Sequence, residues 1–130
     1  MPGNQRRDML MEKNTALDRY LFAVQTLKTK YLCVRSVDVA HYLAVSKAAV
    51  STAVRRLREQ GLIEVGTDGD LVFTEQGRRQ IEPLNDRVSF FRQKLIDAGI
   101  EPALALRDAV SLSVEMSEES CTALRTMLRG

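Results

Sequence analysis

The side chains best suited to contacting a nucleic acid gather between residues 46 and 60, SKAAVSTAVRRLREQ. Hydroxyls can bond to phosphates or base edges, small side chains let the backbone approach the bases, and arginine can donate two hydrogen bonds to guanine. The segment holds four basic residues and one acidic residue, whereas the whole chain has a formal net charge of +2. We predict DNA contacts by Arg35, Ser36, Ser46, Lys47, Ala48, Ala49, Ser51, Thr52, Arg55 and Arg56.

Apolar residues three or four positions apart place this segment on the second of two short helices. They are Val37, Ala40 and Leu43 in the first helix and Val50, Val54 and Leu57 in the second. Ser36 and Ser46 can cap the two helices, because a serine hydroxyl accepts from free backbone N–H groups. Helices over residues 36–43 and 46–60, joined by a turn of about three residues, form a helix-turn-helix.

A short hairpin is predicted directly after the second helix. Residues 62–65 and 71–73 are apolar strands, and Asp68-Gly69 between them is a strong hairpin signal. A helix-turn-helix followed by such a hairpin is a winged helix. The wing carries Asp68 and Asp70, and two carboxylates facing phosphates would weaken its contact with DNA.

Amphipathic helices are predicted on both sides of this unit. The spacing of apolar residues indicates a helix over residues 15–30 and a long helix over 75–98, in which Pro83 predicts a kink or a break. Two further helices are expected to start at Pro102 and Ser117.

The expected fold is mainly α, in three parts. We predict an N-terminal tail over residues 1–14, a winged helix-turn-helix DNA-binding domain over 15–77 and a helical dimerisation region over 78–130. The last region is interpreted as a dimerisation region because a protein that binds two-fold symmetric DNA must hold two recognition helices about one DNA turn apart.

Composition narrows the class of protein further. No apolar run approaches the roughly 18 residues of a membrane-spanning helix, and the N-terminus lacks a signal-peptide core, so we expect a cytoplasmic protein with no membrane partner.

Cys33 and Cys121 are expected to be small buried apolar residues, with a thiol switch as the alternative. The single histidine, His41, has no catalytic or metal-binding partner in the sequence, so no enzyme is expected.

Six short motifs, in the same order as the predicted elements, point to a known family. They are Val37-Asp38-Val39-Ala40, Leu43-Ala44-Val45-Ser46, Val50-Ser51, Gly61-Leu62-Ile63, Phe73-Thr74-Glu75-Gln76-Gly77 and Glu115-Met116-Ser117. Over residues 17–128 the chain resembles the diphtheria-toxin-repressor family of metal-dependent transcription regulators, including its manganese-responsive branch. The resemblance implies homodimers that bind palindromic operators in double-stranded DNA when Mn²⁺ or Fe²⁺ is bound. It places the base-reading segment at residues 47–52, where the family usually has proline and serines in place of Lys47, Ala48 and Ala49.

The metal ligands that the resemblance implies are missing from their positions. These positions fall on Arg19, Phe22, Val88, Val110, Ser113 and Val114. Manganese and iron prefer carboxylate and imidazole ligands, so none of these side chains suits them. We therefore expect no metal cofactor, and Arg19 would put a fixed positive charge where a cation should sit.

The leading hypothesis is a dimeric DNA-binding transcription regulator, a repressor by resemblance, with an unknown effector. A ligand- or redox-sensing regulator of the multiple-antibiotic-resistance-regulator type is an alternative, although that family's longer wing is missing. A winged-helix module that binds only proteins is another, favoured by the acidic wing and the modest net charge. A third is an ordinary amphipathic helix whose charges are merely solvated.

Overall fold

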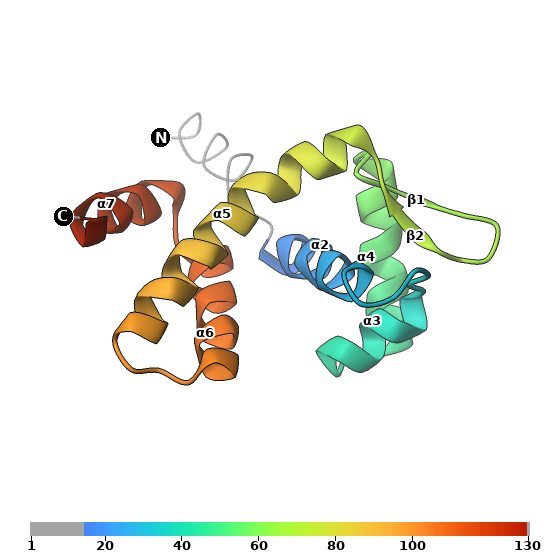
Figure 1. The fold of residues 1–130 in the computed structure, drawn as a ribbon. Helices are drawn as coiled ribbons and strands as arrows, with labels where there is room; N and C mark the ends of the chain where they lie inside the picture. The colour runs from blue at the N-terminus through green and yellow to red at the C-terminus, as the bar shows by residue number, and fades with distance from the viewer. Residues whose placement is uncertain (1–14, 130) are drawn as a thin grey trace, which may run out of the picture.

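The computed structural model describes residues 15–129, which form six helices and a two-stranded sheet (Figure 1). The tail predicted over residues 1–14 lies outside this range. The elements are α2 (Thr15–Lys28), α3 (Ser36–Leu43), α4 (Lys47–Glu59), β1 (Ile63–Val65), β2 (Leu71–Phe73), α5 (Glu75–Asp97), α6 (Pro102–Glu115) and α7 (Glu118–Arg129). The prediction of a mainly α fold with a winged helix-turn-helix is confirmed.

The turn between α3 and α4 is built from local backbone signals. Ala44 adopts the left-handed conformation, with φ 57°, which ends α3. The hydroxyl of Ser46 then accepts a hydrogen bond of 3.1 Å from the backbone N–H of Ala49, so Ser46 caps α4 as predicted. Such a cap is worth about 1 kcal/mol.

The start of α3 differs from the prediction in two ways. Ser36 is the first helical residue, and the capping position is Arg35, whose backbone N–H donates to the Asp38 carboxylate at 2.8 Å. The helix is also turned relative to the predicted face, because Val39 is buried whereas Val37 is 42% exposed. Ala40 still faces the core.

The wing is a tight antiparallel hairpin. Ile63 pairs with Phe73 and Val65 with Leu71. Gly69 has φ 80°, a conformation that glycine adopts without steric cost, and its N–H donates to the carbonyl of Gly66. The predicted hairpin signal at Asp68-Gly69 is therefore confirmed.

Helix α5 connects the wing to the helical region. Thr74 caps it by accepting from the N–H of Gly77 at 2.9 Å. The helix continues through Pro83, so the predicted break is absent. Proline leaves the carbonyl of Arg79 without its helical donor, but both residues are exposed, so water can satisfy that carbonyl.

One aliphatic core runs through the described residues, from Leu17 in α2 to Cys121 in α7. Helix α2 contacts α3 and α4 on one side and α5 and α6 on the other, so it lies between the winged helix and the helical region (Figure 1). Helix α5 extends across the predicted boundary at residues 77 and 78. Among residues 15–129 no helix is long and apolar enough to cross a lipid bilayer.

Candidate nucleic-acid interface

Helix α4 buries one face and presents the other to solvent. Val50, Ala53 and Leu57 are buried. This burial fixes the direction of the opposite face, because residues three or four positions apart share one side of a helix. The exposed side chains on and beside that face include the predicted Lys47, Ala48, Ser51, Thr52, Arg55 and Arg56.

The positive charge of α4 is free to meet an external anion. Lys47, Arg55, Arg56 and Arg58 are all exposed. Within residues 15–129 no carboxylate lies within ion-pair distance of any of them. An approaching phosphate would therefore not have to displace an internal partner, and such contacts supply a large share of the affinity of DNA-binding proteins.

The first turn of α4 adds a second kind of anion contact. Backbone N–H groups at a helix N-terminus lack partners within the helix and carry partial positive charge. The backbone N–H of the half-buried Ala49 donates to the Ser46 hydroxyl. The backbone N–H groups of Lys47 and Ala48 remain available to a phosphate. Ser46 lies exposed beside them, although its hydroxyl is already engaged as the cap.

Arg35 joins α3 to the wing. Its Nε donates to the backbone carbonyl of Asp68 at 2.7 Å, and its side chain lies against Gly69. The residue stays exposed, next to the half-buried Ser36. The predicted DNA contacts of Arg35 and Ser36 remain predictions, while the structure assigns Arg35 a role in fixing the wing.

Asp70 belongs to the wing's internal support. Its Oδ1 accepts from Lys28 Nζ at 2.6 Å and from the backbone N–H of Val34 at 2.9 Å. The hydrogen bond from Lys28, followed by that from Val34, lowers the pKa of the Asp70 carboxyl below its ordinary value of 3.8. The prediction that Asp68 and Asp70 weaken the contact of the wing with DNA stays a prediction, and Lys28 pairs the charge of Asp70.

Sequence reasoning missed this contact between α2 and the wing. Lys28 and Asp70 are 42 positions apart, and neither belongs to a recognisable motif. A general signal was available: an aspartate beside a turn glycine often accepts backbone hydrogen bonds. That signal does not name the partner.

The six positions implied for metal ligands gather where α2, α5 and α6 meet. Arg19, Phe22 and Val110 line one cavity, and Phe22 and Val88 line a neighbouring one. Ser113 and Val114 are fully buried in α6. The positions thus converge, but their side chains do not fit Mn²⁺ or Fe²⁺, which require carboxylate or imidazole donors. Within the described part of the chain no three His, Cys, Asp or Glu residues are grouped as a metal site would need.

The remaining candidate residues are the single histidine and the two cysteines. His41 is exposed on α3. Cys121 is buried, as predicted, whereas Cys33 is only half-buried, and both thiols are free.

The comparisons with known proteins agree with this geometry. Residues 9–71 match the family model of the iron dependent repressor N-terminal DNA binding domain. The transcriptional regulator MntR of Escherichia coli O6:H1 is 29% identical over 109 residues, covering 84% of this chain and 70% of that protein. MntR of Salmonella typhimurium is 26% identical over 107 residues, covering 82% and 68%.

Two solved structures share the fold. The manganese regulator SloR superposes with a TM-score of 0.67 at 19% identity, over 92% of this chain and 55% of that one. The hypothetical protein SSo2273 from Sulfolobus solfataricus gives a TM-score of 0.58 at 20% identity, over 89% and 88%. The resemblance inferred from the sequence is confirmed, and residues 9–71 carry the DNA-binding domain of the iron dependent repressor family.

Proposed function

We propose that this chain regulates transcription as a homodimer that binds a palindromic operator through the exposed face of α4. The observation that carries the proposal is the surface of α4. Its N-terminus is capped and carries small side chains, and its basic side chains are exposed without ion-pair partners among the described residues. This arrangement suits a helix in the major groove, with small residues near the bases and arginines within reach of guanines or phosphates. From the match of residues 9–71 to the iron dependent repressor family we infer that it acts as a repressor.

The surface of the helical region supports the homodimer. Helix α7 contacts α5 and contributes Cys121 and Leu124 to the core, and it leaves Met127 and Leu128 exposed by 69% and 41%. Leu104 at the start of α6 is also exposed. Exposed apolar side chains of this size suit contact with a second copy.

We further propose that the protein acts without the metal ion that its family name implies. Arg19 supplies a cation at a position where a ligand would be needed, and Val88, Val110 and Val114 supply hydrocarbon. Isothermal titration calorimetry with Mn²⁺ and with Fe²⁺ tests this directly. We expect no saturable binding in the micromolar range, and a stoichiometric micromolar site would contradict the proposal.

The DNA-binding proposal is tested by selecting bound sequences from a random double-stranded pool. We expect an enriched sequence with two-fold symmetry. Its affinity should fall by orders of magnitude between low and moderate salt, because bound phosphates release counterions. A protein that binds no selected duplex, or binds without dependence on salt, would instead favour a module that contacts only proteins.

A further inference from the structure

A cavity lies where the winged helix meets the helical region. Its volume is about 360 Å³, within the range of roughly 300–1,000 Å³ that small-molecule sites occupy. It lies between α2, α3 and α6. Its lining residues are Arg19, Phe22, Ala23, Tyr42, Leu43, Ala103, Leu106, Arg107 and Val110.

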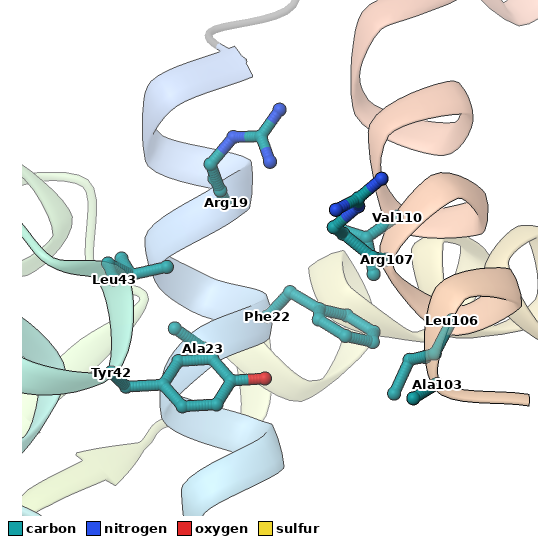
Figure 2. Close-up of a pocket in the computed structure, with 9 residues that line it drawn as sticks. All are labelled: Arg19, Phe22, Ala23, Tyr42, Leu43, Ala103, Leu106, Arg107 and Val110. Atoms are coloured by element: carbon teal, nitrogen blue, oxygen red, sulfur yellow. The ribbon is translucent and has the colours of Figure 1, made fainter.

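The lining has the composition of a site for an amphiphilic anion. Figure 2 shows Arg19 on α2 facing Arg107 across the cavity on α6, with the ring of Phe22 projecting between the two helices. The hydroxyl of Tyr42 points toward the same gap (Figure 2). The other lining residues are apolar and no carboxylate is among them, so the cavity pairs a hydrocarbon wall with two cations.

The existing partners of the two arginines are weak. Arg19 lies 3.5 Å from Glu115, and Arg107 lies 3.5 Å from its neighbour Asp108. These ion pairs are solvent-exposed, and such pairs contribute little. A ligand carboxylate can therefore compete with Glu115 and Asp108 for the two guanidinium groups. Because these two acids already offset the charge of the two arginines, a ligand with more than one negative charge would be disfavoured.

From these observations we propose that the cavity binds a small organic monoanion, a carboxylate on an apolar body of about the size of an aromatic ring system. The arginines would bind the carboxylate, since guanidinium matches carboxylate with two parallel hydrogen bonds. Phe22, Leu106 and Val110 would contact the apolar body. The site thus takes an organic anion where a metal-dependent relative would hold a cation.

The cavity is placed to affect DNA binding. Tyr42 and Leu43 are the last two residues of α3, directly before Ala44, where the chain turns toward α4. Arg107 and Val110 belong to the helical region. A ligand held by both sides fixes the position of the helix-turn-helix relative to the helical region, and so couples its own binding to that of DNA. This step rests on the proposed DNA-binding function, whereas ligand binding itself does not.

Calorimetry on the DNA-free, full-length protein tests the site, with 2-naphthoate as the probe and the neutral 2-naphthamide as its control. We expect one saturable site for 2-naphthoate. Arg19→Gln and Arg107→Gln should each weaken binding about tenfold, the loss expected for one charge-assisted hydrogen bond. Arg79→Gln removes an exposed arginine of α5 outside the cavity and should leave binding unchanged. No saturable binding, equal binding of the amide, or insensitivity to both cavity variants would overturn the proposal.

A second measurement separates the site from its coupling to DNA. We expect saturating 2-naphthoate to change the affinity of the wild-type protein for its selected duplex by about fivefold or more, and to change that of Arg19→Gln less. An unchanged affinity in a protein that binds both would overturn the coupling. If 2-naphthoate binds as expected but no duplex does, the site stands and the proposed DNA-binding function fails.

Discussion

Replacing Asp70 with alanine should destabilise the protein, although the residue lies on a short surface hairpin. The change removes the acceptor for Lys28 at 2.6 Å and for the backbone N–H of Val34 at 2.9 Å. Val34 is fully buried, so its N–H would lose its partner away from water. A hydrogen bond to a charged group contributes about 1.5–3 kcal/mol, and a buried donor without a partner costs about 1–3 kcal/mol. Because the ion pair is partly exposed, we expect a total loss of about 2–3 kcal/mol.

Thermal unfolding followed by circular dichroism measures this loss. At fixed protein concentration, 2–3 kcal/mol corresponds to a fall in Tm of roughly 7–11 °C for a chain of this length. Asp68→Ala is the matched control, because it removes the same charge from an exposed position in the same turn. Equal effects of the two substitutions, or none from Asp70→Ala, would refute the role assigned to Asp70.

The pH dependence provides a second readout of the same contact. The pKa of Asp70 is lower in the folded state than its ordinary value of 3.8, so its stabilising contribution is present above that pH. The contribution is lost as the pH falls through the folded-state pKa. The difference in unfolding free energy between wild type and Asp70→Ala should therefore be full at neutral pH and shrink below pH 3.8. A constant difference would mean that the charge is not involved.

Two further substitutions test the fold and the assembly. Gly77→Ala would place a Cβ 2.0 Å from the carbonyl oxygen of Leu62, so the start of α5 must move away from the backbone at Leu62. We expect urea unfolding to report a loss of at least about 3 kcal/mol, and a wild-type midpoint would contradict that packing. Met127→Glu should weaken the proposed homodimer at least about tenfold in sedimentation equilibrium, whereas Thr122→Glu, elsewhere on α7, should not. Equal association by both variants would place the dimer contact elsewhere.

The helices and the wing could be predicted because their signals are local. A serine before α4, a glycine in the hairpin and a threonine before α5 each act within three residues, and the structure uses all three. The start of α3 was less predictable, because Ser36 was expected to cap the helix. The carboxylate of Asp38 instead accepts from the backbone N–H of Arg35, and the capping position falls on Arg35.

The contacts between segments far apart in the chain could not be predicted from the sequence. Periodicity assigns a residue to a face of its own helix, but it does not say which other element meets that face. The pairing of Lys28 with Asp70 and the approach of Arg107 to the Arg19 side of α2 depend on how the helices pack. The resemblance to a family did place Arg19, Phe22 and Val110 near one another, because it carried three-dimensional information that a single sequence lacks.

The effect of Arg55→Ala on affinity for the selected duplex tests most directly whether α4 binds DNA through its exposed basic face. Arg55 is exposed and has no ion-pair partner within residues 15–129, so the fold should not change. Fluorescence anisotropy at several salt concentrations should show a loss of about 1–3 kcal/mol if Arg55 contacts a base, or a salt slope lower by about one if it contacts a phosphate. Arg79→Ala, an exposed arginine on α5, should leave both quantities unchanged. Wild-type affinity and salt slope in Arg55→Ala would contradict the account.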